Sequence, residues 1–252
     1  MGSVGSSLPS YDYDNPTKFT DNPTSTTKWF NNEKLSNYAE WKDGLTTAEK
    51  SAISSFTGSG YKSYNMGQLY DTDWGSMDEQ QKEYAGHLYD AISKFELRKP
   101  ITVYRKATTE LFGMDGMSMS DLKSLEGQIV HSNGFMSTSA GTQGIGINSS
   151  ECQMKIIIPK SVGAGAWVAN HSVVGTSERE FLLNNNGFFK IDKVSKGTNG
   201  KPFIEMRWVG QSKDQIFAKD TNPVINKSGF TEKGKKGTIS TKTVGKTVKK
   251  KK

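Results

Sequence analysis

The segment SKFELRKPITVYRKA, residues 93–107, marks a change in the character of the sequence, and this change decides the fold class. Before Pro100 the apolar residues follow helical spacing. After Pro100 come short β-rich runs separated by Gly, Asn and Ser. An order of helices first and strands second is typical of an α+β domain rather than of alternating βαβ units. The sequence therefore predicts an α+β fold.

Three segments around and before this point have the spacing of amphipathic helices. They are TTKWFNNEKLSNYAEW (26–41), TTAEKSAISSF (46–56) and SMDEQQKEYAGHLYDAISKFEL (76–97). Thr46 with Glu49, and Ser76 with Glu79, have the spacing of capping boxes, which predicts two helix starts. In the third segment an apolar stripe predicts a face buried in the core: Tyr84, Leu88, Ala91, Ile92 and Phe95.

The β-rich runs after Pro100 predict the strands of the domain. They are ITVYRKA (101–107), QIVHSNGFMSTSA (128–140), QMKIIIP (153–159), AGAWVAN (164–170), REFLL (179–183), FFKIDKV (188–194) and PFIEMRWVG (202–210).

Composition argues against several classes of protein. A single cysteine, Cys152, and three widely spaced histidines form neither a disulfide framework nor a metal centre, so we expect no metal. No run approaches the roughly 20 apolar residues that span a bilayer, so we expect no membrane contact. The N-terminus, MGSVGSSLPS, lacks the pattern of a signal peptide. Because the mean hydropathy is −0.63, we expect part of the chain to stay unfolded, including a flexible segment at residues 1–26.

The positive charge is concentrated at the C-terminal end. The whole chain carries +7, whereas residues 213–252 carry twelve lysines against three acidic residues and so a net +9. This tail has almost no apolar content, which predicts disorder. Two interpretations stay open: a solubilising extension, or an electrostatic arm that contacts nucleic acid or another polyanion.

The segment VVGTSEREFLLNN, residues 173–185, places Glu178 and Glu180 on either side of Arg179. In an extended segment the two glutamates share one face and repel each other, so the pair needs a reason. Carboxylate pairs around a sugar stabilise an oxocarbenium ion and activate a nucleophile. The alternative is a solvated strand start whose charges never meet. We expect Arg179 to point away from both.

Two other strands and a turn carry polar side chains suited to a ligand. Arg105, with Lys106 beside it, suits bidentate recognition of phosphate. In GFMSTS, strand alternation places Ser137 and Ser139 on one face and Thr138 on the other. The turn-rich SSFTGSGYKSYN (54–65) presents Tyr61 and Asn65.

In this order and at these spacings, the motifs resemble the arginine-serine-glutamate class of mono-ADP-ribosyltransferases. The resemblance is strongest to the enzymatic subunits of clostridial binary actin-modifying toxins and to related bacterial and phage enzymes. It covers about residues 45–208 and rests on FTGSGYKSYN (56–65), VYRKA (103–107), GFMSTS (134–139), MKIIIP (154–159) and SEREFLLNNNGFFKIDKV (177–194). It implies N-terminal helices packed on two antiparallel, mixed β-sheets, with a catalytic domain at 27–212 and a basic, disordered tail at 213–252.

The resemblance also implies the roles of the site residues. Glu180 would stabilise the oxocarbenium ion, Ser137 would hold Glu180, and Glu178 would orient the acceptor. The residues implied to bind NAD are Arg105, Lys106, Tyr61, Asn65, Gly134, Thr138 and Lys155. Lys155 stands where relatives often have an arginine. Glutamate rather than glutamine at position 178 goes, in this family, with arginine acceptors.

We therefore expect an enzyme that transfers ADP-ribose from NAD to an arginine of a host target protein and releases nicotinamide. It would act in the host cytoplasm as a bacterial toxin, an effector or a phage host-modifying enzyme, delivered without a recognisable signal peptide. Two alternatives are kept: an NAD glycohydrolase using the same site, and a non-enzymatic basic protein that binds nucleic acid through the tail.

Overall fold

The computed structural model describes residues 11–61, 78–107, 117–132, 134–142, 144, 152–211 and 224–225. The helical elements are α1 (Pro23–Phe30), α2 (Tyr38–Gly44), α3 (Thr47–Ser55), the π-helical turn η1 (Phe56–Gly60), α5 (Glu79–Ser93), α6 (Met119–Ser124) and the 3₁₀ turn η4 (Gly175–Glu178). The strands are β1 (Glu96–Leu97), β2 (Ile101–Ala107), β3 (Ile129–Ser132), β4 (Met136–Ser139), β5 (Cys152–Ile158), β6 (Ser161–Val162), β7 (Gly165–Trp167), β8 (Glu180–Leu183), β9 (Gly187–Lys196), β10 (Pro202–Gln211) and β11 (Val224–Ile225). Among the described residues, the α-helices α1, α2, α3 and α5 precede β2, and most of the strands follow it, which confirms the α+β prediction.

Local capping signals place the helix starts. Thr46 and Glu49 form the predicted capping box at the start of α3. For α5 the box is formed by Asp78 and Gln81 instead, so the helix begins at Glu79. Asp78 is the N-cap because its carboxylate accepts from the Gln81 backbone N–H at 2.7 Å, while the Gln81 side chain accepts from the Asp78 N–H. Ser76 lies outside the described residues.

The strands form a nine-stranded sheet and a two-stranded sheet of β1 and β6. The large sheet has the order β11-β3-β9-β10-β5-β2-β4-β8-β7, and β10 runs parallel to β5 while the other pairs are antiparallel. Both β2 and β4 are fully described, and they pair at one position, Tyr104 with Ser139. This junction divides the sheet into a six-stranded and a three-stranded part, and it is where the functional residues gather.

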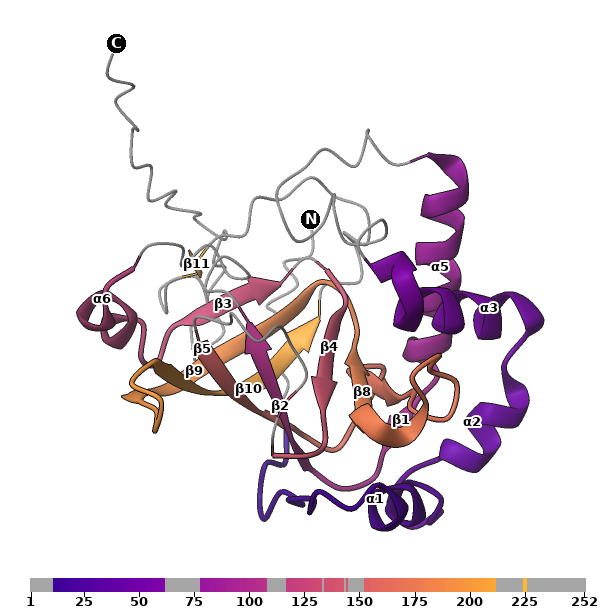
Figure 1. The fold of residues 1–252 in the computed structure, drawn as a ribbon, viewed down its shortest axis with the longest axis horizontal. Helices are drawn as coiled ribbons and strands as arrows, with labels where there is room; N and C mark the ends of the chain where they lie inside the picture. Colours follow the sequence, from indigo (N-terminus) through magenta and orange to yellow (C-terminus); the bar gives the residue numbers. More distant parts are fainter. Residues whose placement is uncertain are drawn as a thin grey trace, which may run out of the picture.

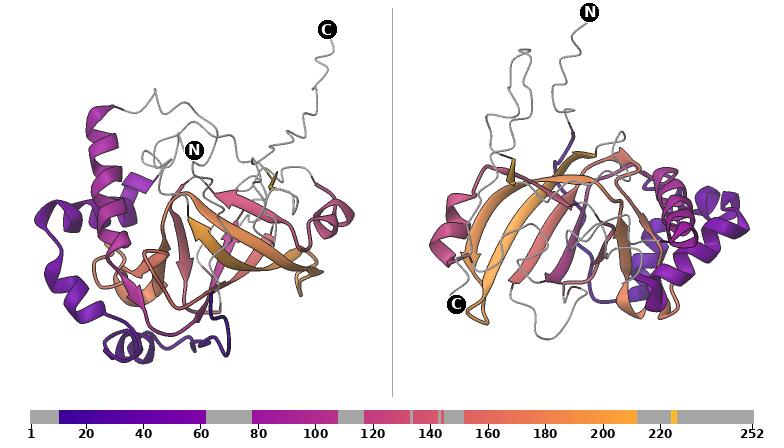
Figure 2. Two further views of the ribbon diagram at one scale, coloured as in Figure 1. Left: turned by 180° about the vertical axis from the view of Figure 1, so that it is seen from behind. Right: turned by 90° about the horizontal axis from the view of Figure 1, so that it is seen from above.

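The helices are divided between the two ends of the sheet. In Figure 1, α1, α2, α3 and α5 lie together on the side of β8, and the view from above in Figure 2 shows the same grouping. The short helix α6 lies at the opposite end and packs beside β9. The predicted stripe on α5 is confirmed, since Leu88, Ala91, Ile92 and Phe95 are fully buried and Tyr84 packs against the core.

A cluster of aromatic rings joins the N-terminal helices to the three-stranded part. Phe30, at the end of α1, stacks on Trp167 with ring centroids 4.5 Å apart and on Phe181 at 5.9 Å. Phe95 and Trp41 continue the cluster, with centroids 5.4 Å apart. Because such buried rings each remove a large apolar area from water, this cluster fixes α1 firmly to β7 and β8.

Two segments expected to be flexible include residues that contact the sheet. In the N-terminal segment, Thr17 bridges to Ile101, Phe19 is buried, and the Tyr13 hydroxyl donates to the Trp208 carbonyl at 2.7 Å. In the C-terminal segment, β11 pairs with β3 along its backbone. These parts are ordered, although the segments are polar, because the edge of a sheet and an aromatic ring can anchor even a polar segment. The rest of the Lys-rich tail lies outside the described residues.

Gly165 in β7 offers a test of the packing. A Cβ at this position would lie 2.5 Å from the Phe181 ring and 2.8 Å from the Leu182 carbonyl oxygen. We expect Gly165→Ala to lower the free energy of unfolding by about 1–3 kcal/mol, because overpacking strains a closed core. Gly44→Ala is the control, since a Cβ there meets nothing within 4 Å. Denaturant unfolding of both variants checks this, and equal stabilities would contradict the packing described.

Within the described ranges, no helix combines the length and apolar character needed to cross a bilayer.

Candidate active site

The junction of the two parts of the sheet brings together three side chains that are far apart in sequence. Arg105 on β2, Ser137 on β4 and Glu180 on β8 come from adjacent strands in the order β2-β4-β8. The Arg105 guanidinium donates to the backbone carbonyl of Ser137 at 2.5 Å, which ties β2 to β4 beyond their single pair. Strand topology therefore assembles the predicted arginine, serine and glutamate in one place.

Glu180 is a buried carboxylate at the first position of β8, where it is paired with Ser139. Its side chain is 2% exposed. The pKa of Glu180 is raised to about 7, and burial is the largest cause. The hydrogen bond from Ser137 lowers this pKa, and the nearby charge of Glu178 raises it. Arg105 also favours the charged form, to a smaller extent. Glu180 is therefore held poised between its two protonation states near neutral pH.

One oxygen of Glu180, Oε2, is buried with no hydrogen-bond partner among the described residues. A buried, unpaired carboxylate oxygen is costly, and folded proteins keep few of them. Such an oxygen can accept a hydrogen bond from a ligand hydroxyl, as a ribose would offer. Its presence beside Arg105, a residue type suited to pyrophosphate, fits a nucleotide substrate.

Glu178 lies on a turn and not on the strand, contrary to the expectation of one extended segment. It ends the 3₁₀ turn η4, and Arg179 after it has the left-handed backbone values φ 50° and ψ 45°. This change of backbone breaks the strand alternation, so that Glu178 is exposed while Glu180 is buried. The two carboxylates stay close enough for the charge of Glu178 to raise the pKa of Glu180.

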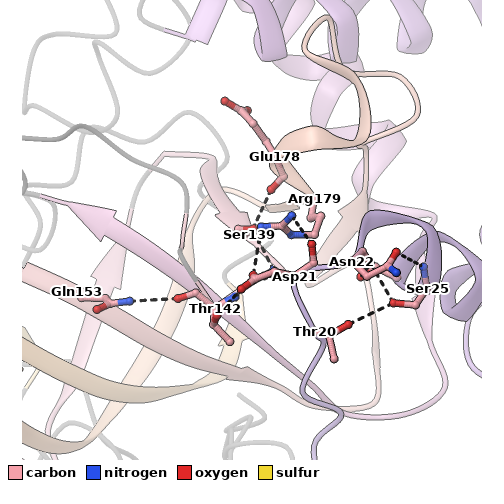
Figure 3. Close-up of polar contacts among 11 residues, drawn as sticks. Thr20, Asp21, Asn22, Ser25, Ser139, Thr142, Gln153, Glu178 and Arg179 are labelled. Atoms are coloured by element: carbon pink, nitrogen blue, oxygen red, sulfur yellow. Dashed lines mark hydrogen bonds and ion pairs between the residues drawn. The ribbon is translucent and has the colours of Figure 1, made fainter.

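The Arg179 side chain contacts Asp21 and points away from Glu178, as predicted (Figure 3). Figure 3 shows its guanidinium turned toward Asp21, in a direction different from that of the Glu178 side chain. The Ser139 hydroxyl donates to the Glu178 carbonyl at 2.8 Å and accepts from the Gly141 N–H at 3.0 Å. Ser139 therefore fixes the backbone of the turn, while Ser137 contacts the carboxylate of Glu180.

Two of the residues expected to bind NAD lie on the opposite face of the sheet from Arg105. Lys155 is in register with Tyr104, and Lys106 with Gln153, so strand alternation places both on the other side. Lys155 also forms an ion pair with Glu205, with Nζ and Oε2 2.7 Å apart. By register the face of both lysines is also the face of Ser139 and Glu180, because Tyr104 pairs with Ser139 and Ser139 pairs with Glu180. A contact of either lysine with NAD stays a prediction.

The remaining residues expected to bind NAD lie in different surroundings. Thr138 is fully buried and its hydroxyl donates to the Phe181 carbonyl, so it joins β4 to β8 within the sheet instead of facing a ligand. Gly134 is buried just before β4. Tyr61, 46% exposed, follows η1, whose Thr57 hydroxyl accepts from the Val173 N–H at 3.3 Å beside the Glu178 turn. Asn65 lies outside the described residues.

The residues that sequence reasoning missed belong to the support of the turn: Asp21, Gly141 and Thr142. Thr142 contacts Asp21 through both its backbone N–H and its hydroxyl. The sequence contains only a weak indication of the role of Asp21. Asp21 precedes Asn22 and Pro23, a pair typical of a helix start and hence of an ordered entry of the chain.

Comparison with known proteins decides the family. A sequence model described as ADP-ribosyltransferase exoenzyme matches residues 27–216, which is most of the chain. The chain belongs to the ADP-ribosyltransferase exoenzyme family. The activity of this family is NAD-dependent ADP-ribosylation. No curated protein sequence matches the chain significantly.

Solved structures of bacterial ADP-ribosyltransferase toxins share the fold. Plx2a from Paenibacillus larvae matches with a TM-score of 0.65 and 21% identity, over 77% of this chain and 100% of that chain. C3stau2 from S. aureus, solved with NAD, matches with a TM-score of 0.63 and 18% identity, over 78% and 99%. BECa, the toxin of a binary enterotoxin of C. perfringens solved with NADH, matches with a TM-score of 0.59 and 23% identity, over 74% and 48%.

Among the described residues, no group of three His, Cys, Asp or Glu side chains is arranged to hold a metal ion. NAD as the substrate fits the family to which the chain belongs. Arg105, Ser137 and Glu180 lie together at the junction, and their contact with NAD is a prediction.

Ser137→Ala is expected to shift the pH dependence of NAD cleavage. The Ser137 hydrogen bond holds the pKa of Glu180 down against the effect of burial, so its loss raises that pKa further. We expect the acid limb of kcat/KM to move to higher pH and the rate at pH 7 to fall about tenfold to a hundredfold. Ser161→Ala, in β6 and away from the junction, is the control. An unmoved acid limb would contradict the role of Ser137.

Proposed function

We propose that this chain is an arginine-specific mono-ADP-ribosyltransferase that modifies a protein of a host cell. The observation that carries the proposal is the division between the two glutamates. Glu180 is buried beside Ser137 and Arg105, whereas Glu178 is exposed on the adjoining turn. One carboxylate therefore faces the bound nucleotide and the other faces an incoming macromolecule.

The residues at the junction suit the cleavage of NAD. Arg105 offers a fork of donors that matches the pyrophosphate oxygens. The bond between nicotinamide nitrogen and ribose breaks, the electron pair leaves with nicotinamide, and the ribose becomes an oxocarbenium ion. Glu180, in its charged form, accepts from a ribose hydroxyl and stabilises this cation, while Ser137 holds the carboxylate in place.

The exposed carboxylate suits the second reactant. A guanidinium is protonated at neutral pH and is a poor nucleophile. Glu178 can accept a hydrogen bond from it, orient one nitrogen toward the ribose carbon, and take its proton as the new carbon–nitrogen bond forms. Glutamate at this position goes with arginine acceptors in the family that the sequence resembles, which supports the choice of acceptor. Two structures that share the fold are described as toxins, which supports a host protein as the target.

The test is to incubate the purified protein with labelled NAD and with bacterial and eukaryotic lysates, and to map the modified residue by mass spectrometry. We expect labelled protein bands that carry ADP-ribose on arginine. Modification of asparagine would overturn the arginine assignment while leaving the transferase. Release of nicotinamide without any labelled band in either lysate would favour the glycohydrolase, in which water replaces the acceptor.

A further inference from the structure

Asp21, in the segment before α1, collects four hydrogen bonds from the two loops beside the glutamates. The Arg179 guanidinium donates to the Asp21 carbonyl at 3.1 Å and to its Oδ1 at 3.3 Å. The Thr142 N–H donates to Oδ1 and the Thr142 hydroxyl contacts Oδ2, both at 3.1 Å. We call these three residues, Asp21, Thr142 and Arg179, the Asp21 clamp (Figure 3).

The position of Asp21 is fixed by the start of α1. Its neighbour Asn22 caps this helix, with the Asn22 side chain accepting from the Thr24 and Ser25 backbone N–H groups. At the other end of α1, Phe30 stacks on Phe181, the residue directly after Glu180. The clamp residue is therefore anchored through a single short helix to the strand that carries Glu180.

The clamp adds a side-chain restraint to the backbone of Arg179, whose N–H donates to the Thr176 carbonyl and whose carbonyl accepts from the Ala140 N–H. Arg179 has a left-handed conformation, which residues with a Cβ adopt only when their surroundings impose it. Its side chain is 13% exposed and lies against Gly141, where an added Cβ would fall inside van der Waals contact with the guanidinium. Loss of the Asp21 contacts would remove the side-chain restraint on this conformation.

The two glutamates depend on this restraint to different degrees. Glu180 is held by the ladder between β8 and β4 and by Ser137. Glu178 lies on the turn, where the Ser139 contact to its carbonyl, two backbone hydrogen bonds of Arg179 and the clamp fix it. Among these, the clamp is the contact made by the Arg179 side chain. A change at Asp21 therefore disturbs the alignment of Glu178 more than that of Glu180.

We propose that Asp21 is a positioning residue that aligns Glu178 with the acceptor by holding Arg179 and Thr142. This inference rests on the proposed function, because it assigns Glu178 to the acceptor. The Asp21 side of the ion pair is 47% exposed, and such pairs add little stability, so we assign the contribution of the clamp to geometry. Loss of the clamp should therefore change the ratio of transfer to hydrolysis and not the stability of the protein.

The experiment measures two products in parallel, ADP-ribose attached to protein and nicotinamide released without transfer, for the wild type and Asp21→Ala. We expect transfer to fall about tenfold to a hundredfold, since misplacement of a catalytic group by about 1 Å has effects of this size. The rate of hydrolysis, KM for NAD and thermal stability should stay close to wild type. Asp14→Ala, which removes an exposed carboxylate from the same segment, is the matched control.

Gly141→Ala gives a second, independent way of breaking the clamp. Its Cβ displaces the Arg179 guanidinium, a side chain that can move, so the fold is preserved. We expect the same shift from transfer to hydrolysis as in Asp21→Ala. The transfer rate of the double variant should be no lower than that of either single variant, because both substitutions remove the same contact between Arg179 and Asp21. Additive losses would overturn the clamp.

Amide hydrogen exchange separates failure of the clamp from failure of the proposed function. In Asp21→Ala we expect faster exchange at Thr142 and along residues 175–180. If the wild type transfers nothing, the proposed function fails, and the exchange result still supports or overturns the clamp. If the wild type transfers ADP-ribose and Asp21→Ala changes neither the product ratio nor the exchange, the clamp is overturned. A parallel loss of both products with lower thermal stability would also overturn it, since the role would then be structural.

Discussion

Glu180→Gln is expected to lower the rate of NAD cleavage by about a thousandfold, or about 4 kcal/mol of transition-state stabilisation. The substitution keeps the shape of the side chain and removes the charge that faces the ribose cation. Because the buried Oε2 has no partner within the described part of the chain, the carboxylate is the group most directly available to the sugar. Release of nicotinamide, with and without an acceptor, measures the effect.

The pH dependence of the wild type provides an internal check. The pKa of Glu180 is raised by burial to about 7, and the proposed chemistry needs its charged form. We therefore expect kcat/KM to rise with pH through about 7, and this limb to vanish in Glu180→Gln. Glu40→Gln, an exposed glutamate on α2, is the control and should keep both rate and limb. Near-normal cleavage by Glu180→Gln would contradict the assignment.

The same variant should be more stable than the wild type at alkaline pH. The folded-state pKa of Glu180 lies above its ordinary value of 4.5, so the folded protein binds the proton more tightly than the unfolded chain. Stability contributed by this group is therefore complete below about pH 4.5 and is lost as pH rises through about 7. The shift corresponds to about 3 kcal/mol. Denaturant unfolding at pH 4.5 and pH 8 should show a gain for Glu180→Gln only at pH 8.

Glu178→Ala is expected to abolish transfer while NAD hydrolysis persists. Transfer should fall about a hundredfold to a thousandfold, because the acceptor guanidinium loses the group that orients it and takes its proton. Nicotinamide release without acceptor should change far less, since Glu178 is exposed and the ribose cation is served by Glu180. Removal of the Glu178 charge should also lower the pKa of Glu180 slightly, which moves the acid limb of kcat/KM to lower pH.

Glu33→Ala, an exposed glutamate elsewhere on the surface, is the control for this variant. Equal losses of transfer and hydrolysis in Glu178→Ala would show that both glutamates serve the nucleotide. Unchanged transfer would remove Glu178 from the reaction, and the arginine assignment would lose its main support.

The sequence predicted the features that depend on local patterns. The capping box at Thr46, the buried stripe on α5 and the strand ITVYRKA follow from side chains a few residues apart, and the structure confirms them. The order of helices before strands likewise gave the fold class. The motifs of the family could also be recognised in the sequence, because each lies within one strand or turn.

The features it could not predict depend on contacts between distant segments. The left-handed Arg179 broke the expected alternation of the two glutamates, and this conformation is supported by Asp21, more than 150 residues earlier. The resemblance implied a contact of Lys155 with NAD, and nothing in the sequence indicated the ion pair that Lys155 forms with Glu205 on β10. Strand register and the partners of a turn are set by tertiary packing, which a single sequence does not display.

The arrangement of β2, β4 and β8 also bears on how the molecule acquires activity. These neighbouring strands begin at residues 101, 136 and 180, so each pairing closes a long loop of chain. Domains dominated by such distant pairings fold slowly, typically in milliseconds to seconds. Arg105, Ser137 and Glu180 meet only when β2, β4 and β8 have paired, since each residue lies on a different one of these strands. If these residues carry out the proposed reaction, the onset of NAD cleavage during refolding reports the pairing of β2, β4 and β8.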